Sequence, residues 1–374
     1  MTRRQRVLKA INHETPDRVP IDMGVHFSTG ISAFAYHDLR KHLGLPTDVI
    51  QVPDNVQMLA RVDADVLERF HCDCMLLNLP FSNPQTWNPR GDYKFHMPSK
   101  LNLARNDNGD WIASTENGKM RMPSGGFFFD GDWLGASDFE GFEDMIIKTA
   151  ARAEYIFKKT DYFTMLMAFS AFFHGIDHAC DMYTDPEDVL EAQKNLLDGQ
   201  LKQAKFVIDH MGKYIQCIAV NSDLGMQSGP MIDPEMFAKF CFPYLKELCG
   251  FIHNNSDLKI FIHSCGAIEP LLPQLIDAGI DIINPVQISA AGMDPALLKE
   301  KYGKKLCFWG GGCNTQAVLG SGTPDDVARN VKELVHIFKP GGGFIFNQVH
   351  NIMGNVPPEN IVAMLDTAFS EGKY

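Results

Sequence analysis

Residues 260–266 read IFIHSCG, a short apolar run that leads directly into His263, Cys265 and Gly266. A run of this length and composition predicts a buried strand. Side chains two positions apart on an extended chain share a face, so His263 and Cys265 can present an imidazole nitrogen and a thiolate to one metal ion. The competing interpretation is a cysteine that acts as a small apolar core residue beside a glycine turn.

This run is one of eight predicted strands that alternate with amphipathic segments, a pattern typical of βα units around a parallel sheet. Two helix starts support it: DPED at residues 185–188 and TPDD at residues 323–326 each combine a capping oxygen, a proline and acidic residues in the first turn. Eight strands with helices between them favour a closed TIM (β/α)8 barrel over an open sheet. The predicted strands are Val19–Met23, Met75–Leu79, Phe163–Met167, Ile215–Val220, Lys259–His263, Ile280–Asn284, Lys305–Trp309 and Phe344–Asn347.

The domain organisation follows from length and from one break in the pattern. A chain of 374 residues suits one barrel domain over residues 1–374, with an N-terminal helical extension. Residues 85–135 depart from the βα alternation, because stretches such as NDNGDW (106–111) and PSGG (123–126) are rich in turn formers. We therefore expect β-hairpins there, inserted over one face of the barrel.

Charge and composition disfavour several classes of protein. The formal net charge of −12 disfavours a nucleic-acid partner, because such binding depends on lysine and arginine that neutralise phosphates. The sequence has no apolar run of membrane-spanning length, and its first residues lack the apolar core of a secretory signal. We therefore expect a cytoplasmic protein without a membrane partner. The nine cysteines are odd in number and scattered, which is unlike a disulfide framework.

Two more polar motifs follow predicted strands. Residues 344–351 read FIFNQVHN and place His350 just past a strand, where it is either a ligand or a residue that caps the loop. Residues 220–227 read VNSDLGMQ, and Asp223 could be a metal ligand, a general base, a residue that orients a ligand, or a helix cap. Because all strands of a barrel end on one face, we expect His263, Cys265 and His350 to converge there with Asp223 close by.

A glycine-rich motif, FWGGGCNTQ at residues 308–316, follows another predicted strand. Its glycines permit the backbone to approach a flat ligand closely, or they serve a tight turn. Cys313 is a possible thiolate ligand, but the glycine run leaves the direction of its side chain undetermined.

Taken in order, these motifs resemble the uroporphyrinogen decarboxylase superfamily over nearly the whole chain. The resemblance begins with RVLKAINHETPDRVP at residues 6–20. It continues through DLGMQ (223–227), HSCG (263–266), FWGGG (308–312), GTP (322–324) and His350 followed by PPENI (357–361).

The true decarboxylases of this superfamily resemble one another in an arginine-containing stretch soon after the first strand, which holds the carboxylates of their substrate. In this chain the corresponding stretch, DMGVHFSTGI at residues 22–31, has no arginine. A substrate with many carboxylates needs several fixed cations, and arginine is their usual source. The decarboxylase interpretation is therefore disfavoured.

The corrinoid-dependent methyltransferase branch carries a His-x-Cys pair and a third ligand, usually cysteine, near the C-terminus, which together hold zinc. His263 and Cys265 match the pair, whereas the third position holds His350, the residue type of the decarboxylases. Histidine is also a good zinc ligand. The resemblance thus implies a zinc site of His263, Cys265 and His350, with Asp223 or Cys313 as possible extra ligands.

Within that branch, the chain is most similar to the substrate methyltransferases that demethylate methoxylated aromatic compounds. We therefore expect methyl transfer from a small-molecule methyl ether to the cobalt of a cobalamin carried by a separate corrinoid protein. No corrinoid-binding module is visible in this sequence. The expected catalytic residues are Asp223, His263 and His350, and the expected substrate-binding residues are His26, Gln227, Trp309 and Asn314.

Three other functions stay open. The same His-x-Cys zinc could activate a thiol that takes methyl from methylcobalamin. A cofactor-free decarboxylase is the second alternative, and a non-catalytic protein that binds a corrinoid protein or a tetrapyrrole is the third. A homodimer is compatible with each of them.

Overall fold

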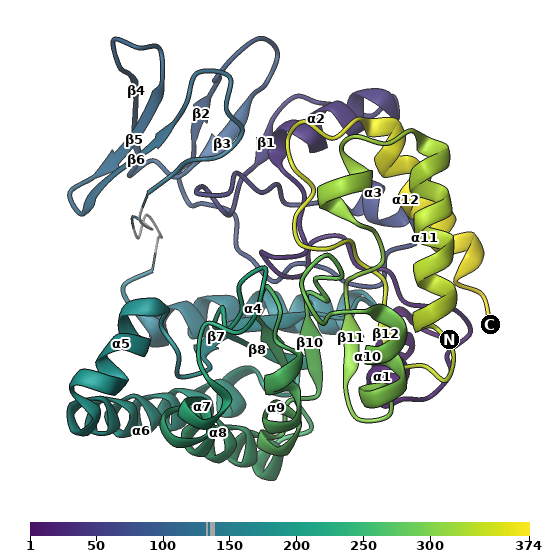
Figure 1. Cartoon of the computed structure of the whole chain (residues 1–374). Helices are drawn as coiled ribbons and strands as arrows, with labels where there is room; N and C mark the ends of the chain where they lie inside the picture. Colours follow the sequence, from purple (N-terminus) through teal and green to yellow (C-terminus); the bar gives the residue numbers. More distant parts are fainter. Residues whose placement is uncertain (132–133, 135–138) are drawn as a thin grey trace.

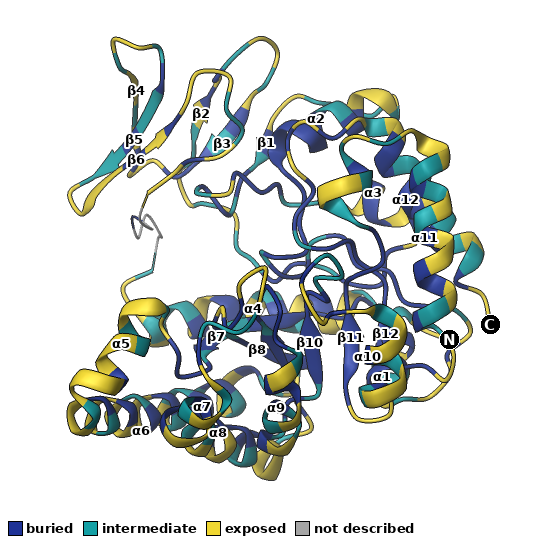
Figure 2. Ribbon diagram, in the orientation of Figure 1, coloured by how far each residue is buried: buried dark blue, intermediate teal, exposed yellow. Residues whose placement is uncertain are grey.

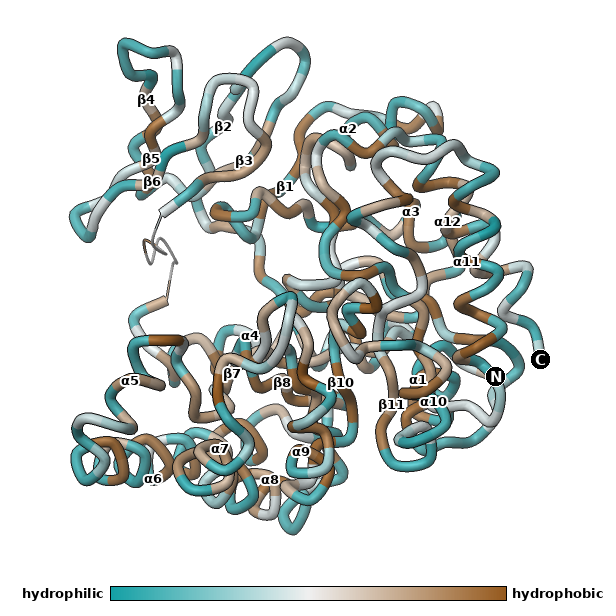
Figure 3. Tube along the Cα trace, in the orientation of Figure 1, coloured by the Kyte–Doolittle hydropathy of each residue, from teal (hydrophilic) through white to brown (hydrophobic). Residues whose placement is uncertain are grey.

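The computed structural model describes residues 1–131, 134 and 139–374, and its centre is a parallel sheet of six strands (Figure 1). The strand order, β12-β11-β10-β9-β8-β7, follows the order of the chain. Most residues of these strands are buried and none is exposed, which explains why the strands read as continuous apolar runs (Figures 2 and 3). The strands are β7 (Met165–Ser170), β8 (Cys217–Asn221), β9 (Lys259–His263), β10 (Ile282–Asn284), β11 (Cys307–Trp309) and β12 (Phe344–Ile345).

Helices join each strand to the next, so the α/β class expected from the sequence is confirmed. Both predicted helix starts are confirmed as well. Pro186 opens α6, and Thr323 forms a reciprocal capping box with Asp326 at the start of α11. These connecting elements are α5 (Ile176–Thr184), α6 (Pro186–Met211), α7 (Pro234–Phe240), α8 (Phe242–Asn255), η1 (Glu269–Leu271), α9 (Leu272–Ala278), α10 (Pro295–Tyr302), η2 (Thr315–Leu319) and α11 (Pro324–Phe338), and α12 (Pro358–Glu371) follows β12.

Two of the eight predicted strands, Val19–Met23 and Met75–Leu79, are not regular strands. Val19–Met23 makes one isolated parallel bridge, from Ile21 to Phe346 beside β12. Met75–Leu79 makes none, and the bridge beside it joins the preceding residue, Cys74, to Phe163 just before β7. Pro20 has no N–H to give to a ladder. The N–H of Ile21 is taken by the side chain of Asp73 at 2.8 Å, and the N–H of Asp73 bonds to the carbonyl of Ile21 at 2.7 Å.

The side chains of the sheet divide between two apolar clusters. On β9, Ile260 and Ile262 pack toward the surrounding helices, whereas Phe261 belongs to an inner cluster with Trp309. All six strands contribute to the inner cluster, and so does helix α1 (Arg3–Ile11). The inner face of the sheet is therefore packed solid.

The expected hairpins within residues 85–135 are present as antiparallel strand pairs. Figure 1 shows two small sheets, β1-β3-β2 and β4-β5-β6, set apart from the main sheet. Strand β1 (Ile50–Gln51) pairs in parallel with β3 and lies outside the predicted stretch. Residues 132–133 and 135 of that stretch lie outside the described residues. The other strands are β2 (Gln85–Trp87), β3 (Phe95–Met97), β4 (Asn102–Arg105), β5 (Trp111–Thr115) and β6 (Gly118–Met122).

The expected N-terminal helical extension is α1, which begins with a capping box between Thr2 and Gln5. The N–H of Gly343, just before β12, bonds to the carbonyl of Ala10 at 2.9 Å, so α1 lies against the amino-terminal end of the sheet. Among the described residues, no helix combines the length and the hydropathy that crossing a membrane requires. The remaining helices are α2 (Ala33–His42), α3 (Ala64–Arg69) and α4 (Phe142–Lys159).

Candidate metal centre

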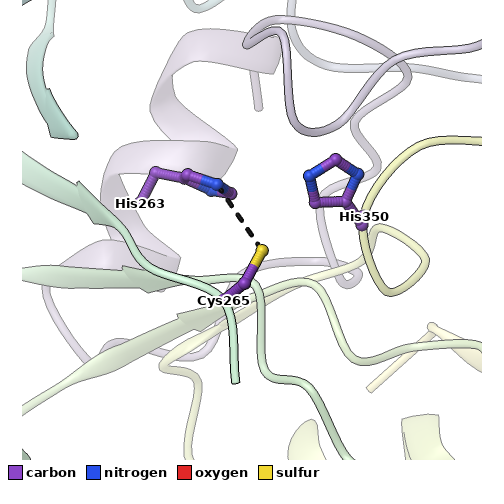
Figure 4. A group of neighbouring side chains, drawn as sticks. All are labelled: His263, Cys265 and His350. Carbon is purple, nitrogen blue, oxygen red and sulfur yellow. Dashed lines mark hydrogen bonds between the residues drawn. The ribbon is translucent and has the colours of Figure 1, made fainter. Parts of the chain in front are cut away.

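Three side chains from two distant parts of the chain meet at the carboxyl ends of β9 and β12. His263, Cys265 and His350 each offer a nitrogen or sulfur atom, and these atoms all lie within 4.8 Å of one another. Figure 4 shows both rings turned toward the same region as the sulfur of Cys265. In the described part of the chain, this is the one group of three or more such side chains close enough to share a metal ion.

The spacing of the atoms can be compared with what zinc requires. In a tetrahedral site with Zn–N near 2.0–2.1 Å and Zn–S near 2.3 Å, a nitrogen and a sulfur ligand lie about 3.5 Å apart. Nε2 of His263 lies 3.7 Å from Sγ of Cys265, close to that value. The ring nitrogen of His350 would have to move toward the other two ligand atoms by on the order of 1 Å at most to complete a zinc site. The donor set of two imidazoles and one thiol therefore fits zinc.

The register of the sheet places three polar side chains in one row. Asn221 of β8 pairs with His263 of β9, and His263 pairs with Asn284 of β10. Residues in register on neighbouring parallel strands point to the same side, so both amides flank the imidazole.

Asn284 fixes the tautomer of His263. Its Nδ2 donates to the carbonyl of Trp309 at 2.9 Å, which orients the amide and leaves Oδ1 facing Nδ1 of His263 at 3.0 Å. An amide oxygen only accepts, so Nδ1 must carry the proton. Nε2 then keeps its lone pair on the side of Cys265, which is the arrangement typical of a metal-binding histidine.

Two glycines allow the Asp223 loop to lie directly on the Cys265 loop. A Cβ at Gly225 would lie 2.7 Å from the carbonyl oxygen of Cys265, and one at Gly266 would lie 2.4 Å from the backbone of Gly225. This close approach lets Oδ1 of Asp223 accept the N–H of Cys265 at 3.0 Å. The same oxygen is 3.7 Å from Nε2 of His263, which is too long for a hydrogen bond. Asp223 thus orients the cysteine loop.

His350 has a left-handed backbone, with φ of 61°. Non-glycine residues rarely adopt this conformation, and where they do it is often at a functional site. Its carbonyl accepts a hydrogen bond of 2.6 Å from Nε2 of Gln348, which holds the turn. The ring lies 5.6 Å from that of His263, edge to face.

Burial favours the neutral forms of His263, Cys265 and His350 when no metal ion is near. It lowers the pKa of His350 to about 4, with a smaller contribution from His263. Burial also lowers the pKa of His263, against the attraction of Asp223. Burial and then Asp223 raise the pKa of the Cys265 thiol to about 12. Neutral imidazoles are the form that binds metal, and a divalent cation would favour the thiolate.

His26 is the one expected substrate-binding residue in contact with this group. Its ring is buried and stacks on that of His263, with 5.6 Å between centroids. Its Nε2 bonds to Oδ1 of Asn221 at 3.0 Å, and burial lowers its pKa well below the usual value. His26 therefore packs against the ring of His263 and helps to hold it in place.

The other expected substrate-binding residues are placed differently. Gln227 bonds to Gln287, which in turn accepts the N–H of Gly266 at 2.8 Å, so it supports the Cys265 loop. Asn314 caps η2. Trp309 has no exposed surface, because it points into the inner cluster and donates to Asp22 at 2.9 Å. Trp309 has no surface in this structure to offer a substrate.

Cys313 does not join the group. It is fully buried in the apolar core, and burial raises its pKa to about 12. Gly311 and Gly312 cause this placement, since their bare backbones pack against Val286 and the ring of Phe346.

Sequence reasoning missed Asn221 and Asn284, although Asn284 ends a predicted strand, as His263 does, and Asn221 directly follows one. A polar residue that ends an apolar strand was therefore a usable signal. It missed Gln287 and Ser28 for lack of any such signal. Oγ of Ser28 bonds to Oδ1 of Asn284 at 2.6 Å.

Replacing Asn284 by leucine is expected to weaken zinc binding about 10- to 100-fold, because the tautomer and orientation of His263 are then no longer held. A competition titration with a chromophoric chelator measures this. The control is Asn360→Leu, which removes another buried amide that bonds to two carbonyls, those of Leu319 and Gly322, outside the metal group. Unchanged zinc affinity in Asn284→Leu, with the fold intact by circular dichroism, would contradict this role.

Comparisons with known proteins place this geometry in a family. Residues 176–370, more than half of the chain, match the uroporphyrinogen decarboxylase (URO-D) family. The chain therefore belongs to this family. It is also similar to the solved structure of a methyltransferase from Methanosarcina mazei, with 14% identity, a TM-score of 0.58, and 99% of each chain covered. At that identity the likeness shows a shared fold. No curated protein matches the sequence.

Proposed function

We propose that this protein is a zinc-dependent methyltransferase that moves a methyl group from a methoxylated aromatic compound to the cobalt of a separate corrinoid protein. The observation that carries the proposal is the convergence of His263, Cys265 and His350 with the tautomer of His263 fixed by Asn284. Three protein ligands leave one coordination position open, which is typical of a catalytic rather than a structural zinc.

We also propose that the fold is a single closed (β/α)8 barrel over residues 1–374. Hydrogen bonds run from β12 through Ile21 and Asp73 to Phe163, just before β7, and so link the two edges of the six-stranded sheet. The inner cluster, which draws on all six strands, supports the same closure. The metal centre would then lie at the carboxyl-terminal mouth of the barrel.

In the proposed reaction, the main task of the protein is to hold the metal ligands and the substrate in position. Zinc, when bound, would act as a Lewis acid on the ether oxygen and stabilise the negative charge that develops there. The methyl carbon passes to cobalt(I) of the partner, the electron pair of the C–O bond stays on the oxygen, and water later protonates the phenolate. Asp223 holds the Cys265 loop, and His26 with Asn284 holds His263, so the ligands need not rearrange during the reaction.

The direct test is a methyl-transfer assay with the zinc-loaded protein, free cob(I)alamin as acceptor and a panel of methoxylated aromatic compounds. We expect the cobalt(I) spectrum to change to that of methylcobalamin only when protein and ether are both present. Methylation of a thiol by methylcobalamin, with no reaction of any ether, would instead support the thiol methyltransferase.

We predict that the protein does not decarboxylate uroporphyrinogen. The arginine-free stretch of residues 22–31 lies against the metal centre through His26. The charge of Asp223 acts on the pKa values of His263, Cys265 and His350, and this acid would repel carboxylates. Formation of coproporphyrinogen by the pure protein, followed by chromatography, would contradict this prediction.

A further inference from the structure

A cavity of about 440 Å³ lies beside β7 and the first half of α4. Its volume is in the range of sites that bind small organic molecules, and most of its lining residues are apolar. The apolar wall includes Phe27, Leu77, Leu79, Phe81, Met145 and Leu166.

The cavity and the metal centre share one chain segment, residues 26–27. Phe27 lines the cavity and directly follows His26, whose ring stacks on His263. Met167 of β7 also lines the cavity and packs against the inner cluster, to which Phe261 belongs. The rings of His26 and Phe261 are 5.0 Å apart. The residues that line the cavity are therefore continuous with the segment and the apolar cluster that pack against His263.

The cavity wall holds one polar atom without a partner. Oδ1 of Asn78 is buried and makes no hydrogen bond within the described chain. A buried acceptor without a hydrogen bond destabilises the protein. A ligand that donates a hydrogen bond to this atom removes that cost, and this contributes to its binding free energy. The charge of Lys148, also at the wall, is already matched by Asp144 at 2.7 Å. The cavity thus favours a neutral ligand with a donor group.

Its size excludes a very small methyl donor as the natural occupant. A water molecule takes up about 30 Å³ in the liquid, and methanol or methylamine roughly two to three times as much, so either would still leave most of the cavity to water. Water against an apolar wall is unfavourable. A substituted benzene ring would bury its faces on the phenylalanine and leucine side chains.

We propose that this cavity binds the aromatic ring of the substrate and that Asn78 accepts a hydrogen bond from a hydroxyl group on that ring. The proposal rests on the proposed function and narrows its substrate to methyl ethers of phenolic compounds.

The test measures equilibrium binding to the zinc-loaded protein by calorimetry, with no corrinoid present. The probes are ortho-methoxyphenol and its hydroxyl-free counterpart, methoxybenzene. The wild type is expected to bind the phenol about fivefold to tenfold more tightly, and Asn78→Leu is expected to remove this preference.

A second variant tests the cavity itself. Met145→Trp fills it and should weaken binding of both probes more than tenfold. The matched control is Ile147→Trp on the same helix, because Ile147 is 56% exposed and does not line the cavity. It should bind both probes like the wild type.

The outcomes separate the two proposals. Binding that depends on Asn78 and Met145, without methyl transfer, would support ligand binding in the cavity and would overturn the proposed methyltransferase function. Two outcomes, each together with methyl transfer, would overturn the proposal that the cavity binds the substrate, but not the proposed function. In the first, Met145→Trp binds both probes like the wild type. In the second, Ile147→Trp weakens binding as much as Met145→Trp does. Equal affinity of the wild type for both probes would overturn the role of Asn78.

Discussion

Cys265→Ala is expected to lose stoichiometric zinc and to lower the rate of methyl transfer by at least about 100-fold. The thiolate is the strongest donor of the three for zinc, and the two remaining imidazoles do not hold a catalytic zinc tightly. The fold should survive, because Cys265 belongs to neither apolar cluster. Metal analysis after gel filtration and the cob(I)alamin assay measure the two effects, and circular dichroism checks the fold.

Two other cysteines serve as controls for this variant. Cys180 is an exposed thiol on α5, and Cys313 is the buried thiol of the glycine-rich motif. Alanine at either position should leave one zinc per chain. Zinc retained in Cys265→Ala, together with normal methyl transfer, would show that Cys265 is not a zinc ligand and would overturn the proposed metal centre of His263, Cys265 and His350.

Asp73→Ala is expected to lower the free energy of unfolding by about 3–5 kcal/mol, the usual cost of breaking a buried ion pair from one side. The Asp73 side chain is fully buried between two arginines, 2.6 Å from Arg6 and 2.7 Å from Arg18, and it also accepts the N–H of Ile21. Alanine would leave both guanidinium groups without their shared carboxylate. It would also release Ile21 from the segment that links the edges of the sheet.

Urea denaturation of Asp73→Ala and of Asp17→Ala gives the comparison. Asp17 pairs with the same Arg6 at 2.6 Å, but its side chain is 46% exposed. Exposed pairs contribute about 1 kcal/mol or less. Equal losses in the two variants would show that burial of Asp73 adds nothing to the stability of this edge.

Much of the metal centre could be predicted from the sequence because its signals are local. His263 and Cys265 stand two residues apart at the end of one apolar run, and His350 lies just past another. The rule that parallel strands end on one side of a sheet then predicts that the three meet. Asp223 could be placed near them in the same way, but its bond to the N–H of Cys265 depends on the contact between Gly225 and Gly266.

The sequence could not predict features that depend on which side of a strand a residue faces or on contacts with distant residues. Trp309 ends β11 just as His263 ends β9, yet its side chain turns into the inner cluster and donates to Asp22. The predicted strands Val19–Met23 and Met75–Leu79 both have apolar composition. In the first, Asp73 takes the N–H of Ile21 that a ladder would need, and the second makes no bridge. Neither the direction of the Trp309 side chain nor the bond from Ile21 to Asp73 can be predicted from the residues nearby in the sequence.

The sequence by itself thus determined the βα alternation, the helix starts at Pro186 and Pro324 and the three side chains at the strand ends, since each depends on residues close together in the chain. Tertiary structure alone decided the row of Asn221, His263 and Asn284, the parallel pairing of β1 with β3, and the cavity lined by Phe27, Asn78 and Met145. These features join segments far apart in sequence. Their register and spacing come from the packing of the whole core, which no short stretch of residues encodes.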